Sequence, residues 1–164
     1  MLSEDQITSV LGLLRSQPVG ALGTLHAGEP FVSMVPFAVL PRAGALVVHV
    51  SALASHTKDM LTSPAVSLMV MGAAGPGSVP LSLPRATFQC QAQPCQESDP
   101  RYPEARRTYI DRIPQSRELF DFGDFSLFIL APRHMRFVGG FAQATSVVQP
   151  ELASVLSVYA ASAA

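Results

Sequence analysis

The sequence contains no tryptophan, two cysteines and a single lysine, Lys58, among its 11 basic residues. Charged residues make up 14% of the 164-residue chain, and the formal net charge is −1. This composition does not provide the basic surface that general nucleic-acid binding requires. With 48% hydrophobic residues, the chain also differs from intrinsically disordered proteins. We therefore expect a folded protein with no nucleic-acid partner.

No apolar run approaches the roughly 18 residues of a membrane-spanning helix, and the N-terminus lacks the basic and apolar segments of a secretory signal. These observations predict a cytoplasmic protein with no membrane partner. Cys90 and Cys95 have no histidine at zinc-finger spacing, and the four histidines form no HxH or HExxH motif. No metal site is therefore predicted.

Hydrophobic periodicity predicts one helix near each end of the sequence. Apolar residues at helical spacing over residues 3–16, with Ser3 and Gln6 placed for a capping box, predict the first helix. Pro150 is expected to open the last one, over about residues 150–162. We expect a single domain over residues 1–164, because the length suits one core of ordinary size.

Seven short β-rich runs lie between these helices, the last two joined almost directly, and from them we expect about six strands. The runs cover residues 19–25, 31–40, 45–51, 65–72, 85–93, 124–132 and 134–140. The unbroken apolar character of residues 65–72 predicts a strand buried on both faces. Helical segments fall too irregularly for a βαβ series, which favours a mainly β (α+β) fold, a small closed or half-open antiparallel barrel.

The segment at residues 50–59 carries the clearest chemistry, because a predicted strand ends there and a helix begins. A helix start offers unpaired backbone N–H groups and the positive end of the helix dipole. Ser55, His56, Thr57 and Lys58 would add hydroxyl and cationic donors within one turn, an arrangement that suits a phosphate monoester. In a second interpretation, Ser55 only caps the helix and the other side chains form a solvated surface.

Asp124 lies among aromatic residues at the start of a predicted strand. As a functional acid it would be buried, and burial would raise its pKa. As a turn residue at the start of a strand it would need no burial. Both interpretations stay open from the sequence.

Seven segments follow one another along residues 5–145 approximately: GALGTL, GEPFVSMVPF, SALASHTK, AVSLMV, RATFQC, GDFSLF and FVGGFAQA. In this order they resemble the FMN-binding split-barrel family related to pyridoxamine 5′-phosphate oxidase, and most closely its haem-utilisation branch. The resemblance implies a six-stranded antiparallel split β-barrel with flanking helices. It also implies a homodimer that binds two FMN molecules where the subunits meet.

The resemblance implies where FMN would bind. The isoalloxazine ring would be lined by Ser33, Met34, Val35 and Pro36 of the second predicted strand. Beside the ring or the ribityl chain would lie Ser51, the last residue of the third predicted strand, and Leu53. The phosphate would be held by Ser55, His56, Thr57 and Lys58, and Arg85 would reach in from the partner subunit.

The implied function is that of an FMN-dependent oxidoreductase acting on a small molecule, in which the flavin carries electrons or hydride. The alternative is a haem-binding or haem-utilisation protein without flavin chemistry. Asp124 matches an acidic position of the haem branch, and His134 is the histidine considered for the haem side. The sequence departs from the pyridoxamine oxidases at His56 and Thr57, where they carry an Arg-Lys pair.

Overall fold

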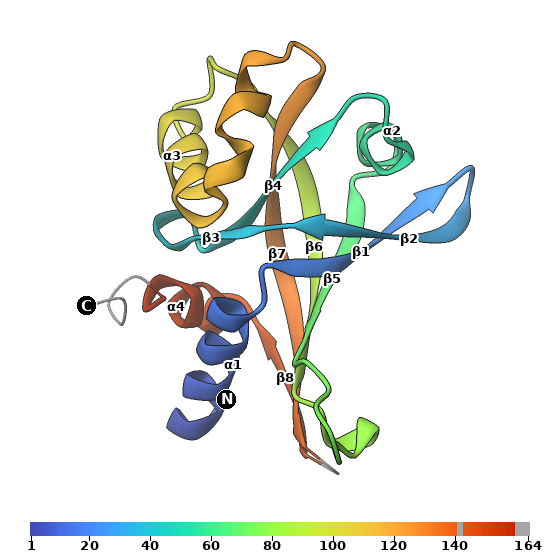
Figure 1. Cartoon of the computed structure of the whole chain (residues 1–164). Coiled ribbons are helices and arrows are strands. Elements are labelled where there is room, and N and C mark those ends of the chain that lie inside the picture. The colour runs from blue at the N-terminus through green and yellow to red at the C-terminus, as the bar shows by residue number, and fades with distance from the viewer. Residues whose placement is uncertain (141–142, 160–164) are drawn as a thin grey trace.

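The computed structural model describes residues 1–140 and 143–159 (Figure 1). Its helices are α1 (Glu4–Ser16), α2 (Ser55–Thr62), α3 (Tyr102–Arg112) and α4 (Glu151–Ser157). Its strands are β1 (Val19–His26), β2 (Glu29–Pro36), β3 (Ala38–Leu40), β4 (Ala45–Ser51), β5 (Ala65–Met71), β6 (Arg85–Cys95), β7 (Phe125–Gly140) and β8 (Gln143–Val148). Short 3-10 helices cover Pro41–Ala43, Pro80–Ser82 and Pro114–Asp121. None of the described helices is long and apolar enough to cross a membrane.

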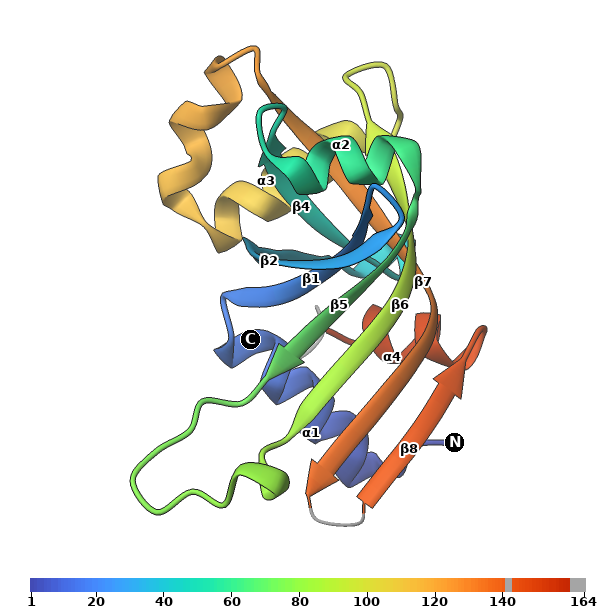
Figure 2. The same ribbon diagram turned by 90° about the vertical axis from the view of Figure 1, so that its right-hand side faces the viewer.

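All strand pairs are antiparallel and form one sheet in the order β2-β1-β5-β6-β7-β4-β3, with β8 paired to β7. The sheet curls around a core, and α2 lies across one end of it (Figure 2). Phe37, Phe88, Phe128 and Phe137 are among the largest fully buried side chains of this core. The predicted antiparallel split barrel with flanking helices is therefore confirmed.

The strand count differs from the prediction in three places. The predicted strand 31–40 is divided at Phe37 into β2, which pairs with β1, and β3, which pairs with β4. The two predicted strands 124–132 and 134–140 form the single 16-residue strand β7. Strand β8 was not predicted, because only Val147 of its six residues is buried.

The first predicted helix is confirmed, including its cap. The Ser3 hydroxyl accepts a hydrogen bond from the Gln6 N–H at 3.2 Å, and the Gln6 side chain accepts one from the Ser3 N–H at 3.0 Å. The last helix begins after Pro150, as predicted, but ends at Ser157. The predicted extension to residue 162 reaches positions that lie outside the described residues.

Strand β5 is buried on one face, so the prediction of burial on both faces is wrong. Val66, Leu68 and Val70 are buried, whereas Met71 is 47% exposed. Methionine and alanine at the alternate positions made the strand look uniformly apolar, although those side chains point away from the core.

Strand β7 is the strand around which the sheet is organised. Its pairing with β6 runs from Leu127 to Val138. On its other edge it pairs with β4 over residues 125–130 and with β8 over residues 134–140. The barrel and the C-terminal hairpin therefore share one continuous strand.

Candidate functional site

Hydrogen bonds between its own residues hold the turn between β4 and α2, at residues 51–58. The Thr57 hydroxyl donates to the Ser51 carbonyl at 2.6 Å, and the Ala54 N–H donates to the same carbonyl at 3.1 Å. Thr57 is 3% exposed. Its hydroxyl proton is therefore used to fix the turn, whereas the sequence had suggested it as a donor to a ligand.

Ser55 does not cap α2, so the capping part of the second interpretation is wrong. The N-cap position is Ala54, no side chain makes a capping hydrogen bond, and Ser55 is the first helical residue. Ser55 and Lys58 are exposed, and His56 is half-buried. Because the first N–H groups of a helix have no partner within it, the start of α2 combines them with a hydroxyl, an imidazole and an ammonium group.

Asp124 supports this turn from the start of β7. The Ser51 hydroxyl donates to its Oδ2 at 3.2 Å and accepts a hydrogen bond from the Leu53 N–H at 3.2 Å. The Ala52 N–H donates to the Asp124 carbonyl at 2.6 Å. Asp124 is exposed, so the interpretation of it as a buried acid is wrong, and its role on the haem side stays a prediction.

A buried carboxylate that the sequence did not single out anchors α2 to β1. Asp59 is 5% exposed; its Oδ2 accepts a hydrogen bond from the Thr24 hydroxyl, and its Oδ1 lies 2.9 Å from Nδ1 of His26. Burial alone would raise the pKa of Asp59, but the hydrogen bonds from His26 and Thr24 hold it below its ordinary value. This link fixes the direction of α2, and therefore the position of its first turn.

We expect the His56 imidazole to be neutral at pH 7. Burial lowers its pKa, an effect that the neighbouring Asp59 carboxylate partly opposes. A neutral imidazole can accept a hydrogen bond or coordinate a metal through a ring nitrogen.

The predicted ring-lining residues lie on β2, which is the first strand in the sheet order. Met34 is 67% exposed, and Ser33 and Pro36 are half-buried. The Val35 side chain lies in the core at 2% exposure, so only its backbone could contact a cofactor. Leu53, at 79% exposure, presents a second apolar surface beside the turn.

Arg85 lies at the opposite end of the sheet from the turn. It pairs with Val138 near the end of β7, whereas Ser51 pairs with Phe125 at its start. Thirteen strand positions correspond to about 40 Å. The structure therefore does not bring Arg85 to the turn of its own chain, which leaves its predicted role from a partner subunit as a prediction.

His134 and Asp124 are also separated within the chain. They lie ten positions apart on or next to β7, a distance of about 30 Å in an extended strand. His134 is half-buried and pairs with Gln89 and Val148. These two haem-side candidates therefore cannot contact one ligand from a single chain. Within residues 1–140 and 143–159, no group of three or more His, Cys, Asp and Glu side chains is arranged to hold a metal ion.

No family model matches the sequence. Among curated proteins, the chain is 33% identical over 141 residues to the chloroplastic heme oxygenase HOZ of Arabidopsis thaliana. The match covers 84% of this chain and 41% of HOZ, so the chain spans less than half the length of this relative.

Two solved structures illustrate the fold. A heme binding protein from Mycobacterium smegmatis matches with a TM-score of 0.81 and 26% identity, covering 94% of this chain and 62% of that one. A putative pyridoxamine 5′-phosphate oxidase from Listeria innocua matches with a TM-score of 0.62 and 16% identity, covering 82% and 98% respectively. At this low identity, the second match shows the fold alone.

Proposed function

Because the chain belongs to the split-barrel proteins related to pyridoxamine 5′-phosphate oxidase and fits their haem-utilisation branch, we propose that it binds haem at the start of α2. The observation that carries this proposal is the exposure of Ser55 and Lys58 beside the half-buried His56 on one helical turn. Haem propionates are carboxylates, which a lysine and helix N–H groups stabilise. Two proteins similar to this chain are a heme oxygenase and a heme binding protein, which favours haem over other anionic cofactors.

His56 is the residue of this turn that suits haem iron. Axial ligation by histidine requires an unprotonated ring nitrogen, and burial lowers the pKa of His56. Asp124, which receives a hydrogen bond from Ser51, would hold the turn in place beside it. Bound haem would supply iron-centred redox chemistry, while these residues bind and orient it. His134 of the same chain lies about 30 Å from Asp124 along β7 and does not reach this turn.

A hemin titration followed by the Soret band tests this proposal. The native chain should shift the Soret band of hemin saturably. His56→Ala should change the position of the shifted band or the affinity for hemin, and Lys58→Ala should lower the affinity for hemin. Arg117→Ala is the control, because Arg117 is exposed in the 3-10 helix Pro114–Asp121. Equal Soret spectra and affinities in all four proteins would contradict a site at α2.

FMN is the second candidate, in an oxidoreductase whose substrate is a small molecule. The exposed hydroxyl of Ser55 and ammonium of Lys58 suit a phosphate, and Met34 and Leu53 offer exposed apolar surface for a ring. A flavin absorbance spectrum of freshly purified protein, followed by an FMN titration, tests this candidate. Saturable binding weakened by Lys58→Ala would support it. No absorbance and no binding would exclude it.

We also propose that two copies of the chain pair through the face that includes β2. Val32 and Met34 are each 67% exposed, and with Val19 and Met71 they line a groove of about 320 Å³. Strand β2 also has only one hydrogen-bonded neighbour, β1, among the described strands. An exposed edge next to apolar surface is typical of a strand covered by a partner. In sedimentation, the native chain should be a dimer and Met34→Asp a monomer; a native monomer would contradict the proposal.

A further inference from the structure

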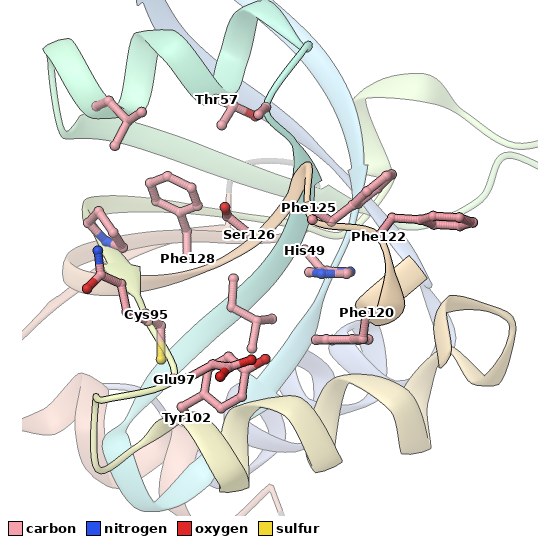
Figure 3. Close-up of a pocket in the computed structure, with 16 residues that line it drawn as sticks. His49, Thr57, Cys95, Glu97, Tyr102, Phe120, Phe122, Phe125, Ser126 and Phe128 are labelled. Carbon is pink, nitrogen blue, oxygen red and sulfur yellow. The ribbon is translucent and has the colours of Figure 1, made fainter. Parts of the chain in front are cut away.

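A cavity of about 440 Å³ lies between α2, the end of β6, the start of β7 and the segment before it (Figure 3). Thr57 and Leu61 of α2 line the cavity, four positions apart on one face of the helix. Asp59, which anchors α2 to β1, falls on the other face. The cavity is therefore separate from the exposed donors at the helix start, although it shares Ala52 and Thr57 with the turn.

The lining of this cavity is aromatic and carries no cation. Five rings contribute to it, those of Tyr102, Phe120, Phe122, Phe125 and Phe128. The lining consists of described residues throughout and includes no lysine or arginine, while Glu97 adds a carboxylate. A phosphate or propionate would meet this carboxylate inside the cavity, whereas the Arg106 guanidinium lies on the Phe120 ring, 5.0 Å from its centroid, and is not part of the lining, so the cavity itself disfavours anions. It suits a flat, apolar molecule.

His49 places one polar group in the wall of the cavity. It is 7% exposed, and its ring stacks on Phe120 with a centroid distance of 3.7 Å and an interplanar angle of 5°. Figure 3 shows the two rings lying parallel. Nδ1 of His49 is buried and has no hydrogen-bond partner among the described residues. Since such an atom carries a desolvation penalty, a side-chain movement that let a ligand in the cavity hydrogen-bond to it would remove that penalty.

We propose that this cavity binds a neutral, flat aromatic molecule with one hydrogen-bonding group, and that Nδ1 of His49 is the polar partner of that group. The stacked Phe120 fixes the orientation of the imidazole, and Phe125, with its centroid 5.2 Å from that of His49, flanks it. Phe122 is 55% exposed, which places an aromatic ring where a ligand would pass from solvent. This proposal does not depend on haem or FMN binding.

N-phenyl-1-naphthylamine is a suitable probe, because it is neutral, has aromatic rings and one N–H donor, and fluoresces more strongly in apolar surroundings. The native chain should bind it saturably with one site per chain. Phe122→Ala should weaken binding about fivefold through loss of an aromatic contact. His49→Phe should weaken it by about the same factor, because it keeps a ring but removes the nitrogen.

Three variants separate this cavity from other apolar or charged surfaces. Leu81→Ala is the matched control, since Leu81 is an apolar residue, 64% exposed, on the distant helix Pro80–Ser82. Met34→Ala tests the exposed face of β2, and Lys58→Ala tests the start of α2. Unchanged affinity in these three supports the cavity. The proposal is overturned if native binding does not saturate, if Phe122→Ala and His49→Phe bind like the native chain, or if only Met34→Ala loses binding.

Discussion

Replacing His49 by phenylalanine should remove a large part of the acid sensitivity of the folded protein. Burial, and to a lesser extent the charge of Arg106, lowers the pKa of His49 from 6.5 to about 4. The unfolded chain therefore takes up a proton at this residue below pH 6.5, while the folded chain does not do so until about pH 4. The stability associated with the neutral imidazole is complete above pH 6.5 and is lost as the pH falls toward 4.

The size of this effect follows from linkage between protonation and folding. Each pH unit between the two pKa values changes the free energy of unfolding by about 1.4 kcal/mol. Between pH 7 and pH 4.5 the native chain should therefore lose about 2 kcal/mol through His49 alone. In His49→Phe the aromatic stacking partner of Phe120 remains but the proton site is gone, so this loss should be absent.

Urea unfolding followed by circular dichroism at both pH values, at one protein concentration, measures this difference. Groups such as His56, Asp59 and Asp99, whose pKa values are also lowered, titrate in all variants and cancel in the comparison. Leu81→Ala, at an exposed residue that does not titrate, is the control and should show the same dependence on pH as the native chain. If His49→Phe loses as much stability between pH 7 and pH 4.5 as the native chain, the buried neutral imidazole does not explain the acid response.

Three further predictions concern Thr57, Cys90 and Gly44. Thr57→Val should lower the free energy of unfolding by about 1–2 kcal/mol, because the buried hydroxyl loses its hydrogen bond to the turn; urea unfolding with Thr57→Ser as control measures this. Burial raises the pKa of Cys90 to about 12, so mass spectrometry should find its alkylation at pH 8 far slower in the folded chain than in urea. Gly44→Ala should lower the free energy of unfolding by about 1–2 kcal/mol, since Gly44 has φ +57° and an added Cβ would lie 3.1 Å from that of Ala153. Gly12→Ala, exposed in α1 with nothing within 4 Å, should instead raise it by up to about 1 kcal/mol.

Each of these predictions has an outcome that contradicts it. A Thr57→Val variant as stable as Thr57→Ser would mean that the hydroxyl does not hold the turn. Equal alkylation rates of Cys90 in the folded and unfolded chains would mean that the strand opens readily. Equal effects of alanine at Gly44 and Gly12 would mean that the left-handed backbone at Gly44 is not strained by a side chain.

Local sequence patterns correctly predicted the features that depend on neighbouring residues within one element or turn. The capping box at Ser3 and Gln6 formed as expected, because both partners lie in one turn. The position of the turn at residues 51–58 was also predictable from the change between strand and helix periodicity. The role of Ser55 was not, because Ala54 takes the N-cap position and the Thr57 hydroxyl binds the Ser51 carbonyl instead.

The remaining features depend on residues far apart in the sequence. From the sequence alone, Asp59 resembles a surface carboxylate on a short helix. In the fold, Thr24 and His26 of β1 lie against it. His49 belongs to an apolar run that predicts only a strand. Its stacking partner Phe120 comes from a segment about 70 positions later, so no local pattern could indicate the cavity.

The sharing of β7 between the barrel and the C-terminal hairpin has a consequence for amide hydrogen exchange. Over residues 127–130 and 134–138, β7 has a neighbouring strand on both edges, whereas β2 and β3 each have one among the strands that the structure describes. The most slowly exchanging amides should therefore follow the length of β7, and those of the outer strands should exchange through smaller openings. Local opening at β2 would then leave Asp124, at the start of β7, attached to the most protected backbone in the molecule.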